Sequence, residues 1–166
     1  MRWVPLLLIL TLAGLGGLFA ILNLKETNKR YFALISVVYL TCLGAILFTP
    51  ISFDGVAIYV MPAGVGRVNL SRLYLHGSGF IENIILTIPL GVLVKKLVPQ
   101  LPVVVMGVLG VITGAMIESL QYYLSHHWLI NRSSDINDVI ANALGVIIGG
   151  IIIAGYYYIH NKEITE

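Results

Sequence analysis

Apolar residues run through most of the chain in stretches long enough to cross a lipid bilayer. A helix needs about 20 apolar residues to span the hydrocarbon core, because it rises about 1.5 Å per residue. Short polar or proline-containing segments separate the stretches, which cover residues 3–24, 31–48, 80–97, 102–124 and 136–160. The pattern predicts an all-α integral membrane bundle of about five transmembrane helices, with residues 1–166 forming a single membrane domain.

The composition supports this prediction and excludes other classes of protein. Of the 166 residues, 58% are hydrophobic and 11% are charged, and the mean hydropathy is +0.92. A soluble domain usually has about 25% charged residues, and a disordered chain has low hydrophobicity, so both classes are excluded. The net charge of +2 gives no electrostatic basis for binding nucleic acid. We therefore expect the lipid bilayer to surround the chain.

The first apolar stretch, residues 3–24, has two interpretations. Arg2 and the small residues that end at Ala20 match the two ends of a secretory signal. However, the apolar part is longer than the core of a typical signal, and residues 25–30 form a short polar turn into the next stretch. We therefore favour a first membrane helix.

Positively charged residues predict how the chain is oriented, because lysine and arginine gather on the cytoplasmic side of membrane proteins. If the helices alternate in direction, six of the ten cations fall on one side, namely Lys25, Lys29, Arg30, Lys95, Lys96 and Lys162. The other side receives Arg2, Arg67, Arg72 and Arg132. We expect an extracellular N-terminus, a cytoplasmic C-terminus and a long external loop over residues 49–79.

Polar side chains in the last three predicted spans collect at one membrane level. A charge at the bilayer centre costs about 2.5–3.5 kcal/mol, so such residues need a partner or a function. The third and fifth spans begin at this level and the fourth ends there, whichever way the chain is inserted. The candidate ligand-binding residues are Asn83, Glu118, Gln121, Arg132, Asp135, Asp138 and Asn142.

Glycines share helical faces with these polar residues. Gly114 precedes Glu118 on one face of the fourth span, and Gly145 and Gly149 follow Asn142 on one face of the fifth. Glycine lets two helix backbones approach closely in lipid. We therefore expect the three glycines to be packing positions, and the simplest arrangement sets the two faces against each other.

The polar residues allow several chemical roles. Glu118, Asp135 and Asp138 are candidate ligands of a divalent cation, because Mg²⁺ and Ca²⁺ prefer carboxylate oxygens. Alternatively, Asp135 or Asp138 caps the fifth helix, and Glu118 pairs with Arg132. Two carboxylates can also act as acid and base in an enzyme, although the polar set contains no HExxH motif, no Ser/His/Asp order and no cysteine nucleophile.

The spacing of these residues resembles the signature of VanZ-like membrane proteins. The matching run is Glu118-x-x-Gln121, then Arg132-x-x-Asp135-x-x-Asp138-x-x-x-Asn142-x-x-Gly145-x-x-x-Gly149, with Asn83-x-x-x-x-x-Pro89-x-Gly91 upstream. The resemblance covers residues 80–150. It implies a bacterial multi-span protein of the cell envelope, in a family whose founding member is tied to teicoplanin resistance, and it leaves the biochemical activity open.

Three hypotheses for the function remain open. In the first, the polar site binds a lipid or glycan head group or a cation, and the partner is a lipid-linked cell-wall intermediate or a lipoglycopeptide antibiotic. In the second, the protein is a membrane enzyme that modifies such an envelope intermediate. In the third, the polar residues form a structural network, and the function lies in binding a partner.

Overall fold

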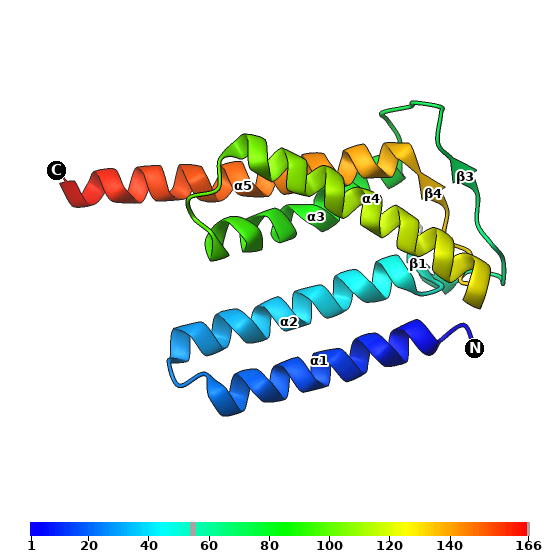
Figure 1. The fold of residues 1–166 in the computed structure, drawn as a ribbon, viewed down its shortest axis with the longest axis horizontal. Coiled ribbons are helices and arrows are strands. Elements are labelled where there is room, and N and C mark those ends of the chain that lie inside the picture. Colours follow the sequence, from blue (N-terminus) through cyan, green and yellow to red (C-terminus); the bar gives the residue numbers. More distant parts are fainter. Residues whose placement is uncertain (54–55, 166) are drawn as a thin grey trace. The chain divides into compact units, whose positions relative to one another are not determined.

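Helices make up most of the chain. The computed structural model describes residues 1–53 and 56–165, the last five by their backbone, so Asp54 and Gly55 of the predicted external loop lie outside the described residues. The helices follow one another along the chain (Figure 1) as α1 (Val4–Asn23), α2 (Thr27–Phe48), α3 (Ser78–Leu97), α4 (Val103–Trp128) and α5 (Ile136–Thr165). The predicted all-α class is therefore confirmed.

Four of these helices are long and apolar enough to cross a membrane. They are α1, α2, α4 and the part of α5 from Ile136 to His160. The remaining predicted span corresponds to α3, which is 20 residues long, contains Pro89, and ends its last turn with Lys95 and Lys96. The structure is that of a membrane helical bundle, and the crossing by α3 stays a prediction.

The chain divides into two compact units, which we describe one at a time. Unit 1 comprises Met1–Val68 and Leu120–Ser133, and unit 2 comprises Asn69–Ser119 and Ser134–Glu166. Each unit is thus assembled from two separate parts of the sequence. Helix α4 contributes its C-terminal end to unit 1 and the rest of its length to unit 2.

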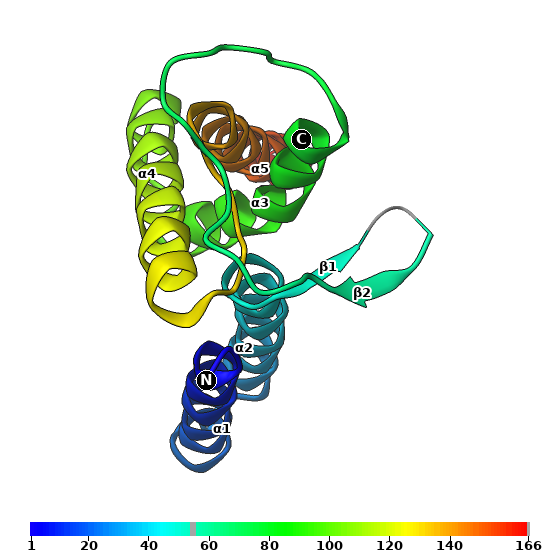
Figure 2. The same cartoon turned by 90° about the vertical axis from the view of Figure 1, so that its right-hand side faces the viewer.

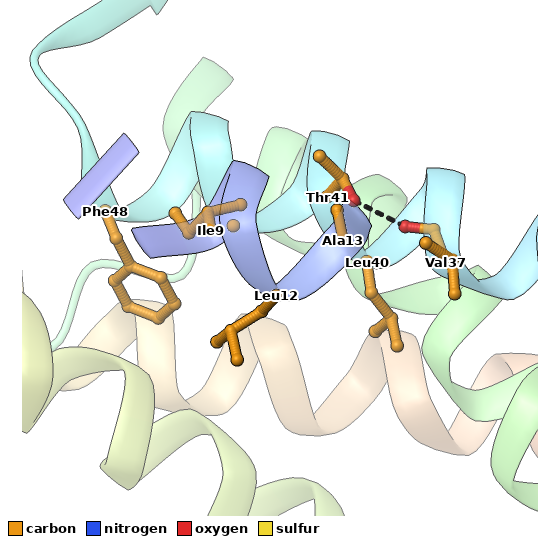
Figure 3. A pocket seen from close by; sticks show the side chains of 8 residues that line it. Ile9, Leu12, Ala13, Val37, Leu40, Thr41 and Phe48 are labelled. Carbon is orange, nitrogen blue, oxygen red and sulfur yellow. Dashed lines mark hydrogen bonds between the residues drawn. The ribbon is translucent and has the colours of Figure 1, made fainter. Parts of the chain in front are cut away.

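Helices α1 and α2 form a hairpin in unit 1. Between them lies an apolar hollow of about 310 Å³ (Figure 3), lined by Ile9, Leu12, Ala13, Val37, Leu40, Thr41, Gly44 and Phe48. The hydroxyl of Thr41 is satisfied within its own helix, because it donates to the carbonyl oxygen of Val37 at 2.6 Å. The lining is therefore apolar, and such a surface can contact the hydrocarbon chains of lipids.

The long connection between α2 and α3 contains short strands. In unit 1, β1 (Ile51–Phe53) pairs antiparallel with β2 (Ile58–Val60), with Ile51 opposite Val60 and Phe53 opposite Ile58. Figure 2 shows this hairpin extending from the end of α2. The structure also contains β3 (Val68–Asn69) and β4 (Ser134–Asp135), and β4 leads directly into α5.

In unit 2, glycines bring α3 and α5 into close contact, and the two helices lie side by side (Figure 2). A Cβ on Gly91 would collide with the backbone of Val146, and a Cβ on Gly149 would collide with the backbone of Ile88. Gly145 faces the same helix, at the backbone of Ile84. Only residues without a side chain allow the backbones to approach this closely.

The structure pairs the glycine faces differently from the simplest expectation. Gly114 of α4 does lie against α5, beside the backbone of Val139. The glycine face of α5 does not pack against Gly114, because Gly145 and Gly149 face α3. Helix α5 therefore packs on two neighbours with two different faces, and the expected meeting of the two glycine stripes is wrong.

We expect Gly149→Ala to destabilise the protein, because its Cβ would collide with backbone atoms of α3. Backbone atoms cannot move aside by changing rotamer, as a side chain can. The free energy of unfolding should fall by about 1–3 kcal/mol, the usual cost of overpacking. Gly155→Ala is the matched control on the same helix, since nothing lies within 4 Å of the added Cβ. Thermal unfolding of both variants in detergent checks this, and equal melting temperatures would contradict it.

Candidate functional site

Asp135 directly precedes helix α5 and caps its first turn. Its Oδ1 accepts a hydrogen bond from the backbone N–H of Asn137 at 2.9 Å and a second from the Asn137 side-chain amide at 2.6 Å. A side-chain oxygen that satisfies the second N–H of a helix is a typical N-cap. Of the alternatives left open by the sequence, capping by Asp135 is therefore present in the structure.

Two residues from the connection before α3 also bind the Asp135 carboxylate. The side-chain amide of Asn69 donates to Oδ1 at 2.9 Å, and the hydroxyl of Tyr74 donates to Oδ2. Burial raises the pKa of Asp135, but the hydrogen bonds from Tyr74 and Asn137 outweigh it and hold this pKa below the ordinary value. The same hydrogen bond raises the pKa of Tyr74, because it retains the phenolic proton.

Glu118 joins α4 to the start of α5 within unit 2. Its side chain is buried, with 7% exposed. Its Oε2 accepts the backbone N–H of Asp135 at 2.8 Å, and its backbone oxygen accepts the hydroxyl of Ser134 at 2.9 Å. The carboxylate is thus held at a fixed position beside the first turn of α5.

Asp138 and Asn142 continue the polar face of α5 by one turn each. The side chain of Asn83 on α3 lies near the carboxyl group of Asp138. Asn142 is fully buried, with its Cβ against Gly114, one turn away from Glu118 on α4. Neither its amide nitrogen nor its amide oxygen has a hydrogen-bond partner among the described residues. We call Asn83, Glu118, Asp138 and Asn142 the acid–amide site.

The acid–amide site brings acidic side chains close together. Glu118, Asp135 and Asp138 are close enough to repel one another. In the described part of unit 2, no lysine or arginine forms an ion pair with them. Uncompensated carboxylates attract cations and hydrogen-bond donors.

The three carboxylates are not arranged as the predicted metal set. Among the described residues, no group of three His, Cys, Asp or Glu side chains is placed to hold a metal ion. The physical reason lies in Asp135, because Asn69, Asn137 and Tyr74 already occupy both of its oxygens. Glu118 and Asp138 are therefore the acids left for a ligand.

Arg132 belongs to unit 1 and binds backbone rather than an acid. Its guanidinium donates to the carbonyl oxygen of Thr49 at 3.1 Å and to those of Ile46 and Ile51. Ile46 and Thr49 lie at the C-terminal end of α2, where helix carbonyls lack intrahelical partners and favour a cation, and Ile51 lies in β1 just beyond it. Burial lowers the pKa of Arg132. The residue predicted to meet an anion therefore closes a helix end.

Gln121 also lies in unit 1. Its side-chain nitrogen donates to the carbonyl oxygen of Leu47 at 3.1 Å, near the same end of α2. Its side-chain oxygen is buried and has no partner in the described chain. Of the seven predicted residues, unit 2 thus brings together Asn83, Glu118, Asp135, Asp138 and Asn142, and unit 1 holds Gln121 and Arg132.

Sequence reasoning missed several residues that build the site. Asn137 is buried beside Asp135, and Asn69 and Tyr74 bind the same carboxylate. Thr87 of α3 donates its hydroxyl to the backbone oxygen of Asn142 at 3.1 Å. Asn137 does not share the helical face used to select the other residues of α5. Asn69 and Tyr74 stand more than 60 residues away in the chain, so no local spacing connects them to Asp135.

Comparison with known proteins gives one match. A family model described as VanZ/LLP1 matches residues 35–157, which include the whole of α3 and α4 and every residue of the acid–amide site. No curated protein and no solved structure matches the chain.

The lowered pKa of Asp135 predicts how stability depends on pH. A carboxylate with a lowered folded pKa stabilises the protein above its unfolded pKa of about 3.9 and loses this contribution as the pH falls through the folded value. Thermal unfolding in detergent should therefore show that the protein loses stability as the pH falls below about 3.9. This loss should be smaller in Asp135→Asn.

Tyr74→Phe removes one of the hydrogen-bond donors to Asp135. Its loss of stability at low pH should lie between that of the unchanged protein and that of Asp135→Asn. If Asp135→Asn and the unchanged protein depend on pH in the same way, the assignment of the stabilising contact to the carboxylate is wrong.

Proposed function

This chain belongs to the VanZ/LLP1 family, and we propose that it is a cell-envelope membrane protein whose acid–amide site binds a polar head group bearing a cation or N–H and O–H donors. The observation that carries the proposal is the amide of Asn142. It is fully buried beside the position of two carboxylates and has no partner among the described residues.

The unpartnered amide argues for a ligand. A buried polar group without a hydrogen bond costs about 1–3 kcal/mol. Helix packing alone gives no reason to bear that cost, since an apolar side chain of similar size fills the same space. A head group that accepts from the Asn142 nitrogen and donates to its oxygen would remove the cost.

The carboxylates define the charge of the ligand. Glu118 is buried and Asp138 is half-buried, and no cation of unit 2 in the described chain neutralises them. A buried acid group needs hydrogen-bond partners, and hydrogen bonds in which one partner is charged are the strongest. An ammonium group, or a sugar rich in hydroxyl and amide hydrogens, supplies such bonds.

The position along the helices supports a head group rather than a ligand buried at mid-membrane. Asn83 lies in the second turn of α3, and Asp138 lies in the first turn of α5. The ends of membrane helices lie at the interface, where lipid-linked cell-wall intermediates and lipoglycopeptides present their polar parts. On the predicted orientation this interface is extracellular, which is consistent with a role in teicoplanin resistance.

We expect Glu118→Gln combined with Asp138→Asn to reduce teicoplanin resistance to that of a bacterial host that lacks the protein. The substitutions replace two acid groups by amides of similar size, so the contacts that the acid groups make with the antibiotic or its target are lost. The measurement is the inhibitory concentration of teicoplanin, with membrane abundance determined in parallel. Glu26→Gln is the control, because it removes an exposed acid in unit 1, outside the acid–amide site.

The outcomes separate the three hypotheses. If the double variant has normal abundance and unchanged resistance, head-group binding at this site is not needed for resistance and the proposal is wrong. If every variant that loses resistance also loses folded protein from the membrane, the polar residues form a structural network. A new lipid species that appears in extracts only when the unchanged protein is present favours an enzyme, and mass spectrometry detects it.

A further inference from the structure

The segment from Leu70 to Leu75, which we call the apolar segment, exposes its leucines although its backbone is fixed. It lies in unit 2 between Asn69 and the start of α3. The exposed fractions are 75% for Leu70, 65% for Leu73 and 55% for Leu75. Exposed leucines in one short segment are an apolar patch that calls for an apolar or amphipathic environment.

Four hydrogen bonds fix the backbone of the apolar segment. Around Arg72, the backbone N–H donates to the Asn69 side chain at 2.9 Å, and the carbonyl oxygen accepts from the side chains of Asn69 at 2.8 Å and Asn137 at 2.9 Å. The backbone N–H of Tyr74 donates to the Asn137 side chain at 2.8 Å. Since these contacts hold the backbone, the leucines are presented outward by the fold itself.

These contacts also place the apolar segment at the ends of two helices. Asn137 and Asp135 belong to the start of α5, whose residues Ile136–His160 are long and apolar enough to cross a membrane. The segment then leads into α3, which begins at Ser78. Tyr74 adds an amphipathic ring whose hydroxyl is anchored on Asp135. Tyrosine and leucine at the end of a membrane helix are typical of the head-group region.

The cation in the apolar segment selects the kind of lipid. Arg72 is exposed and lies between Leu70 and Leu73, and its hydrogen bonds to other described residues use only its backbone atoms. A guanidinium beside inserted apolar side chains lies at the depth of lipid phosphates. We propose that the apolar segment inserts into the head-group region of the bilayer and that Arg72 binds the phosphate of an anionic phospholipid.

The occupant is a lipid surface because the segment lies at the start of α5, a helix long and apolar enough to cross a membrane, and because it carries an exposed cation beside exposed leucines. The proposal does not depend on the ligand of the acid–amide site, since none of the four residues of that site belongs to the segment. A second copy of the chain is the competing occupant, and the experiment distinguishes the two.

The test measures the depth of a nitroxide label in lipid nanodiscs. Leu73→Cys is labelled in a Cys42→Ser background, which removes the natural cysteine. Ile152→Cys, exposed on α5, is the reference for the membrane interior, and Glu26→Cys in the turn before α2 is the reference for water. We expect the Leu73 label to be more accessible to oxygen and less accessible to a water-soluble nickel chelate than the Glu26 label.

Arg72→Gln tests the lipid specificity. Nanodiscs of phosphatidylcholine are compared with nanodiscs that also contain phosphatidylglycerol. We expect phosphatidylglycerol to increase the depth of the Leu73 label in the unchanged sequence and in the control Arg67→Gln, but not in Arg72→Gln. The fold is retained in this variant because the side chain of Arg72 makes none of the four fixing hydrogen bonds.

Three results would overturn the proposal. Accessibility at Leu73 equal to that of the water reference shows that the segment does not enter the bilayer. Spin–spin broadening between labels on different chains shows that a second copy covers the segment. A depth that is the same with and without phosphatidylglycerol contradicts the role of Arg72.

Discussion

The carboxylate of Asp135 connects the parts of unit 2 that are far apart in sequence. It caps α5 through Asn137 and holds the connection before α3 through Asn69 and Tyr74. The N–H of the same residue positions the carboxylate of Glu118 on α4. One residue therefore fixes the helix start, the approach of the preceding connection and the orientation of a buried acid, and the acid–amide site depends on all three.

The apolar pattern was sufficient to predict the helices but not their partners. Continuous stretches of apolar residues have one stable form in a bilayer, because the backbone must satisfy its own hydrogen bonds there. Helical phase shows that Gly145 and Gly149 share a face, and this holds in the structure. Phase carries no information on which neighbour that face meets, and Gly91 of α3 was the partner that the pattern did not identify.

Spacing also grouped much of the candidate site, since Asp138 and Asn142 share a face of α5 and Glu118 of α4 lies beside the start of that helix. Spacing did not predict the role of Arg132. A guanidinium can bind a carboxylate, a phosphate or backbone oxygens equally well on chemical grounds, and the carbonyls of Ile46 and Thr49 leave no mark in the sequence. The partners that a sequence hides most completely are thus backbone atoms and distant loop residues.

The closure of α2 by Arg132 has a consequence for the biosynthesis of the protein. The carbonyls of Ile46, Thr49 and Ile51 accept from Arg132, more than 80 positions later, and the carbonyl of Leu47 accepts from Gln121. These donors belong to residues 120–133, which complete unit 1. While the ribosome is still translating α3 and α4, the end of α2 must be satisfied by water or by lipid head groups. We therefore expect the hairpin of α1 and α2 to reach its final hydrogen-bonded state only after residues 120–133 have been synthesised.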